Sequence, residues 1–193
     1  TLNMARQGLF GEIVHGEGAY IHDLRWDFTY DKNGYADMWR LKENQRNGNL
    51  YPTHGLGPVC QVMDINRGDR LSYMTSTQSD DFSWGKKAAE LARTDDFYKE
   101  FDTNSYRGNM NTSVIRTARG KTIMLQHDVS SPRPYSRHYM ISGTRAVAQK
   151  YPLPARIATG EEWFTEEEMT EITEKYTPEI VRHIGDLAKK VGG

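Results

Sequence analysis

Residues 10–22 alternate between two sets of side chains with the period of a β-strand, and this segment constrains the fold more than any other. Gly16 and Gly18 share one face of the predicted strand with Tyr20 and His22. Glycines inside a strand mark the close approach of a ligand or of another backbone, or a bend under a packed helix. This face therefore predicts either a binding surface or the seat of a helix, next to two polar aromatic side chains.

Further strands follow in the second half of the chain. They are predicted at 71–78, 111–117, 122–129 and 135–149, with a tight hairpin at 118–121 and a bend near Gly143. Helical patterns occupy 1–8, 52–66, part of 80–102, and two closing segments at 165–176 and 177–192. This order favours an α+β domain with a mainly antiparallel, open-faced sheet and helices on one face.

Three further local features lead to predictions. Residues 23–49 predict a long polar loop that contains Trp26, Phe28 and Trp39, and long loops with aromatic residues often carry function. The stretch 80–102 fits either a helix or a mobile polar insertion. In 52–66, Pro58 is expected at the first position of the helix, where its missing N–H costs nothing.

The composition excludes several classes of protein. A chain of 193 residues and 22.2 kDa forms one domain or two small ones. Lys and Arg number 25 against 26 for Asp and Glu, so binding of nucleic acid through bulk charge is not expected. No apolar window long enough for a membrane span is present. The single cysteine, Cys60, excludes an internal disulfide and a cysteine-rich metal site.

The first residues indicate a segment of a larger protein. The chain does not begin with Met, and residues 1–8 read as the last turns of a helix that ends at Gly8. The alternative is a short N-terminal helix in a complete protein. We expect a fragment of a larger two-domain enzyme, in which residues 1–193 form a single domain.

The sequence contains no G-x-G-x-x-G, P-loop, H-E-x-x-H or G-x-S-x-G motif. His54 is the candidate for proton transfer, because imidazole titrates near neutrality, although a solvated residue in a first helical turn fits as well. Tyr20 could act as a base if a cation lowered its pKa, and Arg40 could hold a ligand oxygen; a core tyrosine and a surface arginine are the alternatives. No metal site is expected, since the histidines lack ligand spacing.

Three long motifs, in order, resemble the NAD-dependent α-N-acetylgalactosaminidases of glycoside hydrolase family 109, within the Gfo/Idh/MocA oxidoreductase superfamily. They are the runs GEIVHGEGAYIHDLR at 11–25, NGNLYPTHGLGP at 47–58 and QHDVSSPRPYSR at 126–137. The resemblance implies the C-terminal sheet domain of such an enzyme, with the Rossmann domain that binds NAD absent from this chain. It implies NAD as the cofactor, held by residues upstream.

Carried over by motif, the resemblance implies a set of sugar-contacting residues: Tyr20, Arg40, Tyr51, Pro52, Thr53, His54 and Tyr135. Arg46 lies close to Arg40 in the same segment. The implied catalytic residues are His54, near the C1 leaving group, and Tyr20, as the base at C2 or as the group that orients it.

The implied reaction removes a terminal α-N-acetylgalactosamine with retention of configuration. Oxidation at C3 of the sugar acidifies the C2 proton, elimination breaks the C1 bond, and addition of water and return of the hydride complete the cycle. The isolated chain is expected to be inactive, because hydride transfer needs bound nicotinamide.

Two other functions fit the resemblance. One is the equivalent domain of a sugar dehydrogenase, and the other is a non-catalytic oligomerisation module. A homo-oligomer through the open sheet face is expected. An export signal would lie upstream, so both an exported and a cytoplasmic bacterial enzyme fit.

Overall fold

The computed structural model describes residues 1–25, 29–33, 38–103 and 105–190, so Trp26 and Phe28 lie outside the described residues, as does the predicted end of the last helix at Gly192. The elements in chain order are α1 (Leu2–Arg6), β1 (Ile13–Ile21), α2 (Trp39–Glu43), α3 (Thr53–Val62), β2 (Leu71–Gln78), α4 (Trp84–Ala92), η2 (Asp96–Phe101), β3 (Asn111–Thr117), β4 (Thr122–Asp128), β5 (Tyr139–Gly143), β6 (Val147–Lys150), β7 (Arg156–Ala158), α5 (Glu166–Tyr176) and α6 (Glu179–Lys190).

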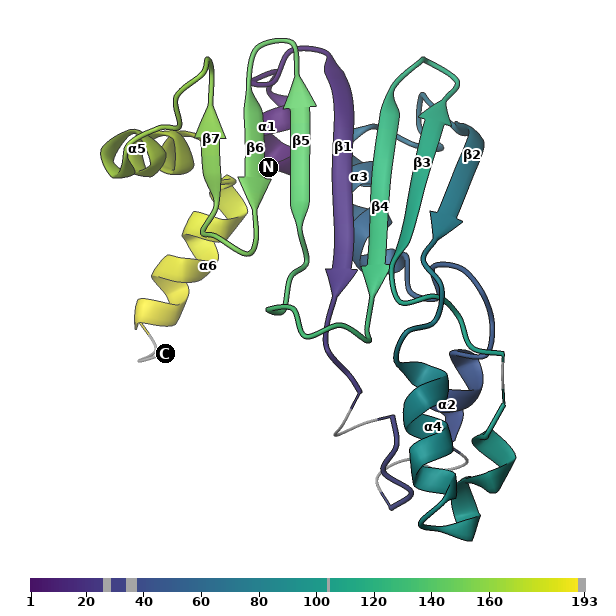
Figure 1. The fold of residues 1–193 in the computed structure, drawn as a ribbon. Coiled ribbons are helices and arrows are strands. Elements are labelled where there is room, and N and C mark those ends of the chain that lie inside the picture. Colours follow the sequence, from purple (N-terminus) through teal and green to yellow (C-terminus); the bar gives the residue numbers. More distant parts are fainter. Residues whose placement is uncertain (26–28, 34–37, 104, 191–193) are drawn as a thin grey trace.

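Among the described residues, the strands form one sheet of seven in the order β2-β3-β4-β1-β5-β6-β7. Every pairing is antiparallel except β1 with β4, which is parallel. Helices α1 and α3 cover one face, and the other face is open (Figure 1). The sheet is therefore mixed but mainly antiparallel, as the α+β class predicts.

The glycines of β1 seat helix α3. A Cβ on Gly16 would lie 2.7 Å from Val59 Cγ1, and a Cβ on Gly18 would lie 2.5 Å from the carbonyl oxygen of Gly55 in α3. The sequence predicted either a binding surface or the seat of a helix on this face, and the structure shows a packed helix. The helix approaches the strand closely enough to hold the side chains of its first turn against Tyr20.

Most of the apolar core lies between the sheet and α3. It includes Phe10, Val59, Met63, Ile123 and Ile141, all fully buried. A second, smaller core lies beyond one end of the sheet, where α2, α4 and η2 pack together around Trp84 (Figure 1). The segment 80–102 is therefore structured, and α2 forms inside the stretch for which the sequence predicted a loop.

Two local predictions were wrong, and one strand was not predicted. The stretch 135–149 is two strands, β5 and β6, joined by a turn, because Thr144 and Arg145 donate backbone hydrogen bonds to Glu12 and Phe10 and so reverse the chain. Helix α3 begins at Thr53, so Pro58 lies inside it. The proline removes the hydrogen bond that its N–H would give to the fourth residue before it. Strand β7 had no recognisable pattern, since it has only three residues.

Among the described residues, no helix is both long and apolar enough to cross a membrane. The closing helices have different environments. Helix α5 begins with a capping box between Thr165 and Glu168 and packs on the core through Met169 and Ile172. Helix α6 leaves its apolar side chains Ile180, Val181, Ile184 and Leu187 exposed.

Candidate functional site

The predicted site residues converge where β1 ends beside the start of α3. A cavity of about 400 Å³ lies there, lined by Tyr20, Trp39, Arg40, Glu43, Asn44, Leu50, Tyr51, His54, His127, Val129 and Arg137. A second cavity, of about 560 Å³, shares His54 and Arg137 with the first and extends toward α5. The smaller cavity is of the size that encloses small ligands, and aromatic, imidazole and guanidinium groups surround it.

Tyr20 is the centre of an aromatic cluster. Its ring stacks on the ring of His54, with centroids 5.1 Å apart, and on the ring of His127, with centroids 6.0 Å apart. Tyr51 and Tyr135 meet Tyr20 edge-on, at 5.2 Å and 6.4 Å. Such edge and stacked arrangements are favourable and fix the orientation of each ring.

The Tyr20 hydroxyl and Nδ1 of His22 lie 2.9 Å apart and share a hydrogen bond. Both residues are on the same side of the chain, two positions apart, which brings them together. Asp23, the sequence neighbour that could have oriented His22, instead binds the guanidinium of Arg25 at 2.9 Å. His22 therefore pairs with the phenol, and the sequence signal for this was their shared face.

Burial sets the protonation states in the cluster. Burial raises the pKa of Tyr20, Tyr135 adds to the rise, and Arg40 and Arg137 only partly oppose it. The phenol is therefore protonated near neutrality, and no cation lowers its pKa below the ordinary value in the described residues. Burial, with Arg137, lowers the pKa of His54, which keeps this imidazole neutral and able to accept a proton.

Arg40 reaches the cavity from α2, and its guanidinium lies over the Trp39 ring, 4.6 Å from the centroid. Arg46 forms an ion pair with Glu43 and does not line either cavity, so Arg40 is the one that faces the site. Arg137 lines both cavities and was not among the predicted residues, although it ends the third motif. Burial, then Arg40, then Arg137 lower the pKa of His22, and the charge of Arg137 also contributes to the lowered pKa of His54.

The remaining predicted residues take different places. Pro52 is the N-cap of α3, and Thr53 makes no side-chain capping bond but lines the larger cavity. Tyr135 lies beside His22, with ring centroids 4.8 Å apart, rather than in the wall of the smaller cavity. The structure thus brings Tyr20, Arg40, Tyr51 and His54 around the small cavity, with the others at its border.

Two further histidines lie on the open face of the sheet, away from the cavities. His15 and His138 flank Glu17 on the open face of the sheet, with the His138 Nε2 2.9 Å from the carboxylate. Gly16 and Gly18, which alternate with these residues, face α3 on the other side. Within the described ranges, no group of three or more His, Cys, Asp or Glu side chains is arranged to hold a metal ion.

Solved structures with the same sheet define the fold. An inositol dehydrogenase homologue from Azotobacter vinelandii, solved with NAD⁺, matches 84% of this chain and 38% of its own chain, with a TM-score of 0.56 and 13% identity. A levoglucosan dehydrogenase solved with NADH matches 82% of this chain and 39% of its own, with a TM-score of 0.53 and 14% identity. The domain therefore has the C-terminal sheet fold of the Gfo/Idh/MocA oxidoreductases.

Sequence comparison is more specific. The family profile described as "Glycosyl hydrolase 109, C-terminal domain" matches residues 1–193. A glycosyl hydrolase family 109 protein from Phocaeicola vulgatus is 44% identical over 98% of this chain and 47% of its own length. One from Shewanella woodyi is 43% identical over 100% of this chain and 43% of its own length. The chain belongs to glycoside hydrolase family 109, and it spans less than half the length of these relatives.

Proposed function

We propose that residues 1–193 form the sugar-binding and oligomerisation domain of a larger, two-domain, NAD-dependent retaining glycosidase. The whole enzyme would remove terminal α-N-acetylgalactosamine from a glycan by oxidation, elimination, addition and reduction. One observation carries the proposal: the cavity of about 400 Å³ joins a neutral histidine, a hydrogen-bonded phenol and an arginine around a space suited to one sugar ring. Membership of a glycoside hydrolase family supports the hydrolytic outcome.

The walls of the cavity suit a neutral sugar. Tyr51 and Tyr20 offer ring edges and faces to the C–H groups of a pyranose, and Arg40 offers a planar set of N–H donors to its hydroxyl or carbonyl oxygens. Arg137 adds a second cation at the junction of the two cavities. A glycan that continues beyond the first sugar would extend into the larger cavity, past Thr53.

The proton transfers are assigned to two groups. His54, neutral because its pKa is lowered, would accept a proton from the incoming water, whereas donation to the C1 leaving group would require the imidazole to be protonated first. Tyr20, whose hydroxyl is bonded to His22, would pass the proton taken from C2 toward that imidazole or hold the sugar for its removal. Since the pKa of Tyr20 is raised, the phenol acts together with His22 rather than as a free phenolate.

NAD fits this domain only in part. The chain has no glycine fingerprint of a dinucleotide-binding turn, so the described residues suit the sugar rather than the diphosphate. When bound by the Rossmann domain that we propose upstream, NAD would accept and return the C3 hydride of the sugar. We expect no turnover by residues 1–193 alone.

The first test is the intact mass of the polypeptide made by its source cell, followed by assay of that protein with an aryl α-N-acetylgalactosaminide. We expect a mass well above 22.2 kDa and release of the aryl alcohol without net NADH formation. A mass of 22.2 kDa would contradict the two-domain proposal. Absence of hydrolysis by the complete protein would contradict the assigned substrate.

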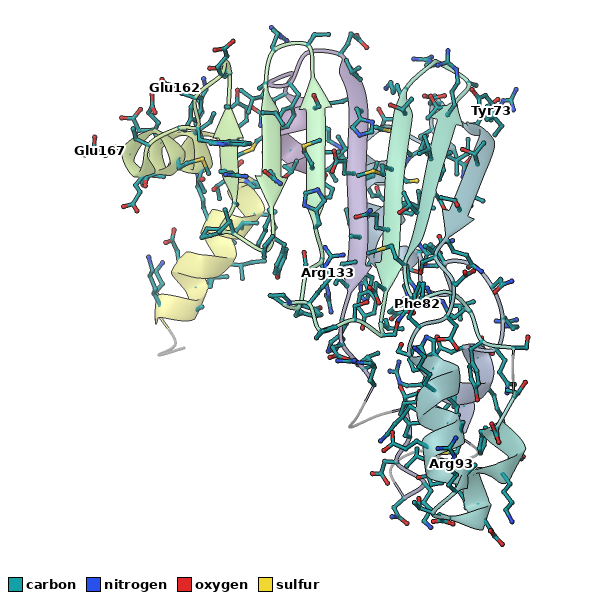
Figure 2. The ribbon with its side chains drawn as sticks, viewed as in Figure 1. Tyr73, Phe82, Arg93, Arg133, Glu162 and Glu167 are labelled. Atoms are coloured by element: carbon teal, nitrogen blue, oxygen red, sulfur yellow. The ribbon has the colours of Figure 1, made fainter. Side chains whose placement is uncertain are left out.

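The second test addresses Tyr20 in the complete protein. Tyr20→Phe removes the hydroxyl that bonds His22 and keeps the ring stacked on His54. We expect it to abolish exchange of the sugar C2 hydrogen with solvent deuterium. Tyr73→Phe is the matched control, because Tyr73 is 61% exposed at the far edge of the sheet (Figure 2). Exchange that survives in Tyr20→Phe would remove Tyr20 from the C2 step.

A sugar dehydrogenase is the second candidate, and the fold it shares with an inositol dehydrogenase homologue and a levoglucosan dehydrogenase favours it. The two candidates differ in the fate of the hydride. Net NADH production from a free sugar would support the dehydrogenase, and hydrolysis with no net NADH would support the glycosidase.

Self-association through the open sheet face completes the proposal. Val114 is 45% exposed on this face, and an apolar side chain exposed on an open sheet is a candidate for contact with a second copy of the chain. We expect the complete protein to be a homo-oligomer by light scattering, and Val114→Glu to shift it toward the monomer. Arg93→Glu, on an exposed residue at the end of α4 and away from the sheet, is the control, and equal oligomer size in all three proteins would refute the interface.

A further inference from the structure

His127 is a buried imidazole that none of the roles above uses. It lies in β4 directly opposite Tyr20 of β1, and its ring stacks on the Tyr20 ring with centroids 6.0 Å apart. The residue is only 2% exposed, yet it lines the cavity of about 400 Å³. Its ring therefore forms part of the floor of the site, between the sheet and the ligand space.

Arg107 lies behind this ring and is fully buried. One of its guanidinium nitrogens is 2.6 Å from Nδ1 of His127, and the other terminal nitrogen donates to the carbonyl oxygens of Asn109 and His127 at 3.3 Å and 3.4 Å. A guanidinium has only donors and stays protonated in proteins. Nδ1 of His127 must therefore accept this hydrogen bond, which places the proton of the neutral ring on Nε2.

The surrounding charges keep the ring neutral. Burial lowers the pKa of His127 to about 3, and the positive charge of Arg107 contributes. Asp128 is the nearby carboxylate, and its Oδ1 accepts hydrogen bonds from Ser130 and Ser131 in the following turn. His127 therefore does not change charge between pH 5 and 8 and cannot serve as an acid or base there.

Nε2 is the ring nitrogen of His127 that is not engaged by Arg107. Within the described ranges, no residue forms a hydrogen bond with Nε2 of His127, whereas Nδ1 is occupied. His127 lines the small cavity and Arg107 does not, so the Nε2 edge, on the side of the ring away from Arg107, faces the ligand space. Nε2 is not one of the buried side-chain atoms that lack a partner, so this N–H is accessible from the cavity and a ligand oxygen there could accept its hydrogen bond.

We propose that His127 is a ligand-binding residue whose Nε2–H donates to a hydroxyl or carbonyl oxygen of the sugar, and that Arg107 is the positioning residue that fixes this tautomer. The identity of the ligand as a sugar rests on the proposed function, whereas the tautomer does not. A fixed neutral donor favours an uncharged oxygen that gains negative charge, such as the oxygen of the C3 ketone when loss of the C2 proton converts it to an enolate. It would bind a cationic amine poorly.

The tautomer is measured first, on the complete protein labelled with ¹⁵N-histidine. We expect a long-range proton–nitrogen spectrum to show Nδ1 of His127 as the nitrogen without a proton and Nε2 as the one with it, unchanged from pH 5 to 8. The signals are assigned by their loss in His127→Gln. A protonated Nδ1, or a ring that titrates in this range, would overturn the role of Arg107.

Methyl α-N-acetylgalactosaminide is then added as the probe. We expect the Nε2 proton of His127 to shift and to exchange more slowly with solvent. A sugar that shifts the His54 signals and leaves Nε2 of His127 unchanged would overturn the contact. If no histidine signal shifts, the proposed sugar specificity fails and this contact fails with it, while the tautomer result stands.

Substitutions of His127 distinguish the effect of its N–H donor from the effect of its ring packing on Tyr20. His127→Phe keeps an aromatic ring beside Tyr20 but has no donor, and we expect sugar affinity to fall about threefold to tenfold. His127→Gln keeps an N–H near the Nε2 position and should retain more of the affinity. Equal affinities would refute the donor. Arg107→Gln retains an N–H donor that can reach Nδ1 of His127 and should preserve the tautomer. Arg107→Met has no donor and should not fix the tautomer. Identical histidine spectra for these two variants would refute the positioning role of Arg107.

Discussion

Replacing Gly18 with alanine tests the contact that positions the whole site. A Cβ at this position would lie 2.5 Å, 2.6 Å and 2.7 Å from three backbone atoms of Gly55, and backbone cannot rotate away as a side chain can. Ordinary contact begins near 3.4 Å, so α3 must move outward by about 1 Å. We expect overpacking of this kind to cost about 1–3 kcal/mol of unfolding free energy.

The same displacement of α3 would also move His54, a proposed catalytic residue. His54 precedes Gly55 in the first turn of α3, and its stacking on Tyr20 depends on the present spacing of 5.1 Å between ring centroids. A misplacement of about 1 Å in a catalytic group can lower a rate by about 10²-fold. If the complete protein has the proposed activity, we expect Gly18→Ala to lower its kcat by about that factor while it remains folded.

The matched control is Gly57→Ala in the same helix. No atom lies within 4 Å of a Cβ at Gly57, and alanine is favoured over glycine inside a helix by about 0.5–1 kcal/mol. This variant should be as stable as the wild type or more so, with unchanged kcat. Urea unfolding and steady-state kinetics on both variants give the comparison. If Gly18→Ala matched Gly57→Ala in both measurements, the close packing of strand and helix would not control the site.

Three further outcomes follow from single side chains. The folded pKa of His127, about 3, lies below the ordinary value of about 6.5, so the unfolded chain binds the proton first. Stability should fall as pH drops from about 6.5 to 3, and His127→Gln should weaken this slope in urea unfolding; parallel slopes would contradict the low pKa. Thr165→Ala removes the capping box of α5, and we expect it to lower the unfolding free energy by about 1 kcal/mol and to speed amide exchange in that helix. The control Thr170→Ala should change amide exchange little. Equal exchange rates in the two variants would contradict a stabilising role of the cap. Arg40→Lys should weaken sugar binding severalfold by calorimetry and Arg46→Lys should not, and the reverse order would exchange their roles.

Local pattern was sufficient for a large part of the fold. The alternation in 10–22 predicted β1, and the pair 111–117 and 122–129 predicted the hairpin of β3 and β4. Thr165 and Glu168, three positions apart before an apolar helical stripe, predicted the start of α5. These elements are set by residues close in sequence, so their backbone preferences and side-chain periods are visible without the fold.

Prediction was weaker where a distant segment decides the local geometry. The turn between β5 and β6 forms because Phe10 and Glu12 accept hydrogen bonds from it, more than 130 residues away in the chain. After Gly143, its residues Thr144, Arg145 and Ala146 lack the usual turn signals, and so the stretch was interpreted as one strand bent near Gly143. Likewise, α3 begins five residues before Pro58, because its packing on β1 outweighs the helix-start signal of proline.

The sequence by itself determined the α+β class, the family and the residue types of the site, because motifs and periodicity are properties of neighbouring positions. Only the tertiary structure decided which of these residues share a cavity. The parallel pairing of β1 with β4 places Tyr20 against His127, and burial of Arg107 behind that ring fixes its proton. Hydrogen bonding, desolvation and charge depend on what surrounds a group in space, so the chemistry of these side chains emerges only after distant strands have packed.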